Sequence, residues 1–349
     1  VTFVLPPALR GSFAESIVQE GIAASHPYGA LVIPKLASAT EVYYTIPSVV
    51  YVPHQAALGD HDQEIGGGVY LLEERPGGNT FSFANFGHTP KTYSTADVIE
   101  LIAESHEYRV DQRSVLRARL LDIWLGDWDR HDDQWRWASF EENGVTVLRP
   151  IPRDRDQVFF KNDGVLDYLA SRPYFNPPLR KFTEKIDHLD GLIWAGKYFD
   201  RSFLHELTED DYVEAAMQMQ KQLSDEIIDR AFHDWPAKVD SLDGARIRSF
   251  LKIRRDDLVD YAKEYFALLS KEVFIPATTD KDVITVEAVG KGRLDVVVSR
   301  EEKDENYVHY HRLFDDDITK ELRIFGLNKQ DSLKIEGNHS SATKIRFVG

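Results

Sequence analysis

The sequence predicts an α+β protein in which strands and helices occupy different stretches of the chain. Short apolar runs bounded by Pro and Gly dominate residues 1–78, runs with helical spacing dominate 79–272, and short strands return in 273–349. A chain of 349 residues, 42% of them hydrophobic, can form about two or three packed units. We therefore expect a small β-rich part that carries one helix, a helical part, and a small all-β domain, either a sandwich or a short β-solenoid.

Composition excludes several functional classes. The 42 Lys+Arg and 58 Asp+Glu residues give a net charge of −16, which argues against a nucleic-acid binder that relies on a global basic field. The absence of Cys excludes disulfides, zinc-thiolate sites and cysteine nucleophiles. No run approaches the roughly 18 apolar residues of a membrane span, and neither a G-x-S-x-G elbow nor an H-E-x-x-H motif is present. The two ends, VTFVLPP and the strand-like KIRFVG, lead us to expect a piece of a longer protein.

The first part is predicted to contain one helix and three strands. Ser12 can cap an apolar-periodic run over residues 13–25, which ends before Pro27. The predicted strands are residues 30–34, 48–53 and 68–74. The glycines at 66–68 predict a turn and not a phosphate-binding loop, because they lack the spacing of either phosphate-loop motif.

Helices and one hairpin are predicted for the middle part. Helical spacing begins after Ser94 and continues over 111–126. Alternating residues on both sides of Asn143-Gly144 predict a β-hairpin, since this pair favours a two-residue turn. Further helices are predicted over about 165–272, including one long helix over 245–272, and six short strands are predicted after Pro276.

Two polar segments flank the predicted hairpin: LGDWDRHDDQW at 125–135 and RPIPRDRDQVFF at 149–160. The hairpin returns the chain close to its origin, so that Asp129 and Asp154 are expected to lie within several ångströms of each other. Clustered carboxylates raise one another's pKa unless a cation neutralises them, and oxygen ligands suit magnesium, manganese or calcium. Two other interpretations stay open: a solvated or capping loop, and acids neutralised by the neighbouring Arg153 and Arg155.

The order of these segments carries a further indication. A helix, an Asp-containing loop, a hairpin and a second Asp follow one another in the active site of protein-kinase-like folds. In those folds the first Asp orients the attacking group, an amide five residues later holds metal, and the second Asp binds the metal that bridges the phosphates.

The motifs also resemble known families. DRHDDQ (129–134) is similar to the D-R-H-x-x-N loop of atypical and lipid kinases, and DRDQVF (154–159) resembles the D-x-D-x-x-F metal motif of CotH-type secretory-pathway kinases. The whole run resembles the kinase-like region of Gram-negative envelope polypeptides that carry a BamA-like outer-membrane barrel. The resemblance covers about residues 5–272. It implies a two-lobed kinase-like domain, with an N-lobe over 1–78 that is incomplete at its start and a helical C-lobe over 79–272.

The resemblance implies roles for seven residues. They are the catalytic Asp129, the metal ligands Gln134, Asp154 and Asp156, and the nucleotide-side residues Glu20, Glu73 and Glu74. Glu15 is an equal alternative to Glu20 for the small-lobe Glu that pairs with the nucleotide-anchoring Lys. Glu73 and Glu74 end the strand that would lead into the adenine-binding hinge.

The sequence departs from the family pattern at two points. Gln134 stands where these families have Asn, and its extra methylene moves the amide oxygen by about 1.5 Å. The anchoring Lys belongs before the early helix, yet the first Lys is Lys35, after it, and Arg10 is the only cation before it.

These observations lead to a functional expectation with two alternatives. The resemblance implies a phosphotransferase that uses ATP with Mg or Mn on a protein or envelope substrate, in the periplasm and associated with the outer membrane. The alternatives are an inactive pseudokinase-like scaffold that binds a partner or an attached barrel, and a phosphoesterase that uses the same carboxylates to activate water.

Other polar and aromatic residues have simpler expected roles. Trp128, Trp135 and Trp137 are predicted to pack in the core, and His131 is predicted to be a structural hydrogen-bond donor. The acidic run 315–317 predicts a solvated turn, with calcium binding as the alternative.

Overall fold

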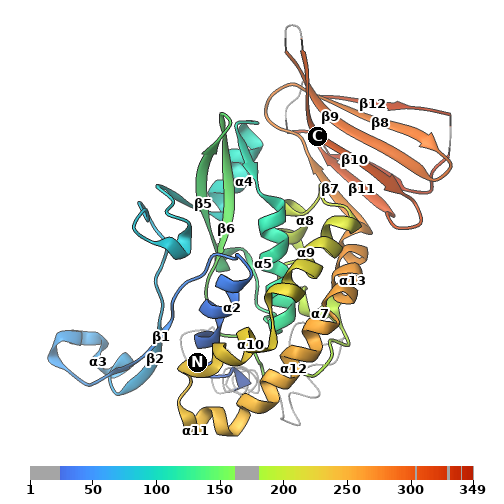
Figure 1. Cartoon of the computed structure of the whole chain (residues 1–349). Helices are drawn as coiled ribbons and strands as arrows, with labels where there is room; N and C mark the ends of the chain where they lie inside the picture. Colours follow the sequence, from blue (N-terminus) through green and yellow to red (C-terminus); the bar gives the residue numbers. More distant parts are fainter. Residues whose placement is uncertain (1–23, 162–180, 303–304, 328–330, 339, 349) are drawn as a thin grey trace, which may run out of the picture.

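The computed structural model has a mixed α+β architecture, as predicted (Figure 1). It describes residues 24–161, 181–302, 305–327, 331–338 and 340–348. The early helix predicted for 13–25, and with it Glu15 and Glu20, falls outside the described residues, as does Arg10. None of the helices in the described ranges is long and apolar enough to cross a membrane.

A two-stranded ribbon forms most of the first part. Strands β1 (Ser48–Val52) and β2 (Gly68–Leu72) pair antiparallel, as expected for two of the predicted strands. Between them lie η3 (Ala56–His61) and α3 (Asp62–Ile65), and the ribbon projects away from the rest of the molecule (Figure 1).

The prediction of a strand over residues 30–34 is wrong. This stretch forms η2 (Gly29–Val32) and the start of α2 (Ile33–Ala39). Pro34 stands in the first turn of α2, where a missing N–H has no cost, and Leu36 and Ala37 are buried in the main core. A short apolar run fits a buried helix as well as a strand, so periodicity alone could not distinguish them.

The predicted hairpin is confirmed at the centre of a four-stranded sheet. Strands β5 (Trp135–Glu142) and β6 (Val145–Pro152) pair antiparallel, with Trp135 opposite Pro152. Asn143 and Gly144 both have positive φ, 53° and 80°, as a type I′ turn requires. Strands β3 (Thr92–Ser94) and β4 (Tyr108–Val110) complete the order β3-β5-β6-β4.

Helices α4 (Thr95–Glu104) and α5 (Gln112–Leu125) have the predicted boundaries. Ser94 and Asp97 form a capping box on α4. The Asp111 side chain accepts the Ser114 N–H at the start of α5, and Gly126, with a φ of 75°, ends it. Most of α5 is buried, and it runs through the middle of the main core.

Further short helices surround α5. They are η4 (Ala84–Phe86), η5 (Asp132–Gln134), α7 (Leu189–Leu192), α8 (Lys197–Phe203), α9 (Glu209–Gln222), α10 (Asp225–Ala231), η6 (Phe232–Asp234), α11 (Ala237–Val239), η7 (Asp240–Gly244), α12 (Ala245–Asp256) and α13 (Leu258–Ser270). The prediction of a single long helix over 245–272 is therefore wrong, because the helix is interrupted at Asp257, between α12 and α13. The apolar spacing continues across the break, so the pattern did not reveal it, although Asp favours helix ends over helix interiors.

The last part contains the six predicted strands and one more. They are β7 (Glu272–Pro276), β8 (Asp282–Gly290), β9 (Arg293–Glu302), β10 (Glu305–Asp315), β11 (Glu321–Phe325), β12 (Ser332–Glu336) and β13 (Lys344–Val348). They form one sheet in the order β10-β9-β8-β12 and another in the order β13-β11-β7, with a shared apolar core. The parallel pairs β7–β11, β11–β13 and β8–β12 resemble the winding of a solenoid, whereas β8, β9 and β10 are antiparallel. The topology thus combines features of both predicted alternatives.

The acidic run 315–317 forms a turn within this part. The Asp315 side chain accepts the Asp317 N–H at 2.9 Å, and the Asp316 side chain accepts the Ala342 N–H at 2.7 Å. The turn is thus confirmed, and calcium binding by the three carboxylates stays untested.

Candidate active site

The loop that follows α5 carries the first acids of the candidate site. Asp127 is buried and Asp129 is half-buried. Burial raises the pKa of Asp129; the positive charges of His131 and Arg130 lower it, and the negative charge of Asp154 raises it further. Asp129 and Asp154 therefore influence each other across the hairpin.

Asp156 is the third acid of this group. Burial raises the pKa of Asp156 to about 6, and the charges of Asp154 and Asp129 contribute to the rise. Asp154 and Asp129 are thus close enough to Asp156 for their charges to act on its carboxyl group.

Asp154 stands in an unusual backbone conformation directly after β6. Its φ is 55°, in the left-handed region that only Asn, Asp and Gly adopt readily. Its N–H donates to the Glu73 carboxylate, at 3.0 Å from Oε1 and 3.2 Å from Oε2. Glu73 at the end of the β1–β2 ribbon therefore reaches the second acidic segment.

The two nucleotide-side glutamates point to different partners. Burial raises the pKa of Glu73, although the bond from the Asp154 N–H opposes this rise, so Glu73 adds a fourth carboxyl group to the cluster. Glu74 instead accepts a hydrogen bond from Asn85 Nδ2 at 3.3 Å. The assignment of both residues to the nucleotide stays a prediction.

Gln134 has a buried side-chain amide in the same loop as Asp129. Its Nε2 lies 3.3 Å from His131 Nε2. Its Oε1 is buried with no hydrogen-bond partner in the described part of the chain. A buried carbonyl oxygen without a partner is costly, and such an oxygen is a ligand that a hard divalent cation accepts. The carboxylates of Asp154 and Asp156 and the amide of Gln134 are ligand types that suit Mg²⁺ or Mn²⁺; their joint role in holding a metal stays a prediction.

Asp127 belongs to the same cluster, although it was not predicted. Both of its carboxylate oxygens are buried without a hydrogen bond in the described ranges, and Arg130 Nη1 lies 3.6 Å from Oδ2. Burial raises the pKa of Asp127 to about 7; Arg130 lowers it and Asp122 raises it. The DWD sequence directly after α5 was the available signal, but it did not indicate which Asp faces inward.

A network of buried ion pairs connects α5 to the loop that carries Asp129. Asp122 Oδ2 lies 3.1 Å from Arg119 Nη1 and 3.2 Å from Arg130 Nε, and Asp122 Oδ1 lies 2.7 Å from Arg155 Nη2. Arg119 also pairs with Asp200, with 2.6 Å from Nε to Oδ1. All five side chains are almost completely buried.

The described contacts of Arg153 and Arg155 bear on one of the open interpretations of the sequence. Arg155 pairs with Asp122 on α5, and Arg153 donates to the backbone oxygen of Asp133 at 3.3 and 3.4 Å. Among the contacts of the described residues, neither arginine pairs with Asp154 or Asp156. These contacts do not support the interpretation in which Arg153 and Arg155 neutralise the flanking acids.

Three arginines line a cavity at the loop that follows α5. This open cavity of about 800 Å³ is lined by Arg75, Arg136 and Arg153, together with His131, Asp132 and Asp133 from the loop. Burial lowers the pKa of Arg136, and the positive charges of Arg75 and Arg153 lower it further. A bound anion would relieve this repulsion.

The first lysine of the chain is engaged elsewhere. Lys35 Nζ lies 2.7 Å from Asp234 Oδ2 and donates to the Arg230 backbone oxygen at 3.4 Å. This places Lys35 against the end of α10 and not among the residues of the acidic cluster.

The tryptophans of this region pack as predicted. Trp135 and Trp137 are fully buried, and Trp135 stacks on Phe199 with 4.4 Å between ring centroids. Trp128 packs edge-on against Phe160. The Trp side chains therefore support the loop and the hairpin.

The raised pKa of Asp156 predicts a pH-dependent difference between the protein and its Asp156→Asn variant. The folded-state pKa of about 6 lies above the unfolded value of about 3.9. The stabilising contribution of Asp156 is thus present below about pH 4 and is lost as the pH rises through about 6. In metal-free buffer, we expect the variant to gain stability relative to the parent protein between pH 5 and pH 8. Urea unfolding at each pH measures this, and a pH-independent difference would contradict it.

Comparisons with known proteins give a likeness to solved structures but no match to a family. No protein-family model matches the chain, and no curated protein matches it. Among solved structures, it is similar to the crystal structure of a Helicobacter pylori proinflammatory kinase, CtkA, with 12% identity and a TM-score of 0.34. The match covers 68% of this chain and 82% of that chain. A likeness of this size does not establish a family or an activity.

Proposed function

We propose that the chain is an ATP-dependent phosphotransferase of the atypical, CotH-like kinase type that uses Mg²⁺ or Mn²⁺. One observation carries the proposal: the charge of Asp154 raises the pKa of Asp129, and the charges of Asp154 and Asp129 raise the pKa of Asp156, so that these carboxyl groups interact across the hairpin. Carboxyl groups that repel one another favour a divalent cation, and Gln134 in the same loop offers an amide oxygen without a hydrogen-bond partner in the described part of the chain. The cavity that His131 and Arg153 line together with Arg75 and Arg136 favours an anionic ligand, as phosphates are, although Asp132 and Asp133 also line it.

Each residue then has a defined task. Asp154, Asp156 and Gln134 hold the cation, which neutralises charge on the phosphate oxygens. Asp129 accepts the hydrogen bond of the acceptor hydroxyl and takes its proton as the oxygen bonds to the γ-phosphorus and the bond to the leaving ADP oxygen breaks. Arg75, Arg136 and Arg153 attract the phosphates electrostatically.

Glu73 has a positioning role in this proposal. Its carboxylate holds the Asp154 N–H and so stabilises the left-handed conformation that directs the Asp154 side chain. Glu74, at the end of the same ribbon, stays a candidate for the nucleotide side, together with Glu20.

A periplasmic, outer-membrane-associated location and a protein or envelope substrate complete the proposal. Both rest on the resemblance of DWDRHDDQWRW and RPIPRDRDQVFF to envelope polypeptides with a BamA-like barrel.

An inactive scaffold is the second candidate. The observation that favours it is the engagement of Lys35 with Asp234, which leaves the described residues of the cluster without a lysine to anchor the nucleotide. Gln134 in place of Asn also favours it.

Thermal unfolding with ATP and Mn²⁺ tests the proposal. A ligand that binds only the folded state stabilises it by RT ln(1 + [L]/Kd), or about 2.7 kcal/mol at 100 times Kd. We expect ATP with Mn²⁺ to raise the melting temperature of the parent protein and to have no such effect on Asp154→Ala. Asp210→Ala, which changes an exposed Asp in the first turn of α9 outside this site, is the matched control and should respond like the parent.

The other candidates predict different results. A shift with Mn²⁺ alone, unchanged by ATP, would favour the phosphoesterase. No shift with any of these ligands at millimolar concentration would favour the scaffold.

A further inference from the structure

The C-terminal strands contact the helical part through a set of hydrogen bonds. The Thr279 N–H donates to the Ala103 backbone oxygen at 2.8 Å. Arg312 on β10 donates to the His205 backbone oxygen at 2.7 Å and to Ser270 Oγ at 3.1 Å. The C-terminal strands therefore contact the end of α4 through the segment before β8, and the ends of α8 and α13 through β10.

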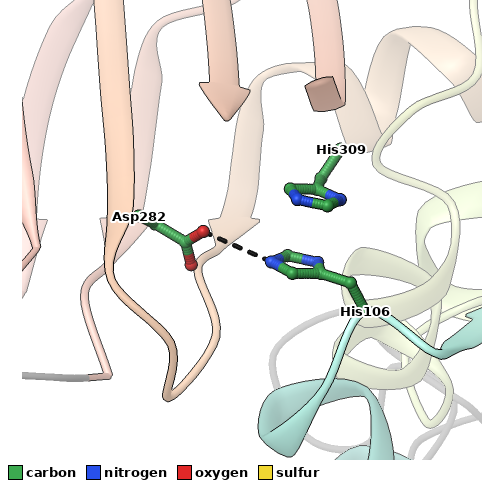
Figure 2. Close-up of side chains that lie close together, drawn as sticks. All are labelled: His106, Asp282 and His309. Carbon is green, nitrogen blue, oxygen red and sulfur yellow. Dashed lines mark hydrogen bonds and ion pairs between the residues drawn. The ribbon is translucent and has the colours of Figure 1, made fainter. Parts of the chain in front are cut away.

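Three potential metal ligands converge at this junction (Figure 2). His106 comes from the loop between α4 and β4, Asp282 is the first residue of β8, and His309 lies on β10. One ligand atom from each residue lies within 4.8 Å of the others. His106 Nε2 is 3.3 Å from Asp282 Oδ1, and the two imidazole rings are parallel, with 3.2 Å between their centroids.

A second layer of contacts orients the carboxylate. Asp282 Oδ2 accepts hydrogen bonds from the Thr278 N–H at 2.6 Å and from Thr278 Oγ1 at 2.9 Å. Its backbone N–H donates to Asp331 Oδ1 at 3.0 Å. Asp282 Oδ1 is thereby directed at His106, and outer contacts of this kind are typical of carboxylates that bind metal ions.

Burial favours a bound cation at this junction. The Asp282 side chain is fully buried, and 17% of the His106 side chain is exposed. A buried carboxylate is costly unless a positive charge or a metal ion neutralises it.

The surroundings leave room for an ion and its water. A cavity of about 130 Å³, lined by His106 and His309 together with Tyr108, Glu206 and Thr278, lies at this junction. The positive charges of Arg109 and Arg300 act on His309 and oppose a cation there. Arg300 Nη1 is, however, 2.9 Å from Asp280 Oδ2, which offsets part of that charge.

We propose that His106, His309 and Asp282 bind one divalent transition-metal ion of the zinc type, which links the C-terminal strands to the helical part. Two imidazoles and one carboxylate suit Zn²⁺ and not Mg²⁺ or Ca²⁺, and a water occupies the fourth position. Tetrahedral ligands about 2.0–2.1 Å from an ion lie about 3.4 Å apart, which His106 and Asp282 already satisfy at 3.3 Å. His309 reaches the ion when its ring turns out of the stack. This site is separate from the acidic cluster of Asp129.

Titration of the chelator-treated protein with Co²⁺ tests this site. Tetrahedral Co²⁺ with imidazole ligands absorbs strongly in the visible range, whereas octahedral Co²⁺ at a carboxylate site absorbs weakly. We expect the parent protein to bind one equivalent with tetrahedral bands and to release it to Zn²⁺. Because loss of an outer contact alone weakens metal binding about 10–100-fold, His309→Asn and His106→Asn should bind at least about 10-fold more weakly.

Two matched variants define the specificity of the result. His311→Asn removes an imidazole from the same strand, where His311 Nε2 pairs with Asp295 Oδ1 at 2.8 Å on an exposed surface, and it should bind like the parent. His61→Asn, which removes an exposed imidazole paired with Glu64 in the connection between β1 and β2, should also bind like the parent. Circular dichroism and a Zn²⁺-induced rise in melting temperature, present in the parent and absent in His309→Asn, distinguish ligand loss from misfolding. The proposal is overturned if the parent gives no tetrahedral bands, or if His309→Asn gives the same spectrum and affinity as the parent.

Discussion

Asp122→Asn is expected to lower the free energy of unfolding by about 3–5 kcal/mol, the usual effect of breaking a buried ion pair. Asp122 is the common partner of Arg119, Arg130 and Arg155, and all four side chains are almost completely buried. The amide keeps the shape of the carboxylate but removes its charge, so three guanidinium groups lose their shared counter-ion in the interior. A change of this size is a large fraction of the 5–15 kcal/mol typical of a folded domain.

Urea unfolding followed by circular dichroism measures this effect. Glu226→Gln is the matched control, because it makes the same carboxylate-to-amide change in an exposed i,i+4 pair with Arg230 on α10. Exposed pairs of this kind contribute little, so the control should unfold at nearly the same urea concentration as the parent. If Asp122→Asn and Glu226→Gln unfolded at the same urea concentration, the charge of Asp122 in the buried network would contribute nothing to stability.

The network also explains why the acidic loop has a defined shape. Arg130 contacts Asp122 at one end, and its Nη1 donates to the Arg153 backbone oxygen at 2.8 Å, next to Asp154. One side chain therefore links α5, the loop that carries Asp129 and the end of β6. The positions of the candidate site residues therefore depend on the buried guanidinium group of Arg130, which is not itself one of the candidate site residues.

Local patterns in the sequence predicted the elements that local interactions determine. Asn143-Gly144 indicated the hairpin, Ser94 marked the start of α4, and Gly126 ended α5 where the helical spacing stopped. Residues 30–34 and the break at Asp257 were mispredicted because each depends on what the apolar side chains pack against, and a single apolar run does not carry that information.

The candidate site could be predicted only where the chain itself brings residues together. The hairpin joins Asp129 to Asp154 and Asp156, so local reasoning was sufficient for these acids. The bond between Glu73 and the Asp154 N–H joins residues 81 positions apart, and the contact between His106 and Asp282 joins residues 176 positions apart. Neither contact leaves a signature in the sequence near either residue.

Asp129→Asn is expected to reduce the rate of phosphoryl transfer by about 10²–10⁴-fold, the usual contribution of a positioned general base. This follows from the proposed function, in which the Asp129 carboxylate takes the proton of the acceptor hydroxyl. The metal-side residues Asp154, Asp156 and Gln134 are unchanged in this variant. The stabilisation by ATP with Mn²⁺ should therefore persist, in contrast to its loss in Asp154→Ala.

Initial rates of γ-phosphate transfer from labelled ATP, to the protein itself or to water, provide the measurement. Asp210→Asn is the matched control, because it makes the same change at an exposed position in the first turn of α9, outside the candidate site, and it should keep the parent rate. Asp129 influences Asp156 electrostatically, so its neutralisation should also lower the pKa of Asp156 and move the acidic limb of the pH–rate profile of the residual activity to lower pH. A parent-like rate in Asp129→Asn would remove Asp129 from the chemical step, whereas a lower rate without loss of nucleotide stabilisation would separate proton transfer from metal binding at this cluster.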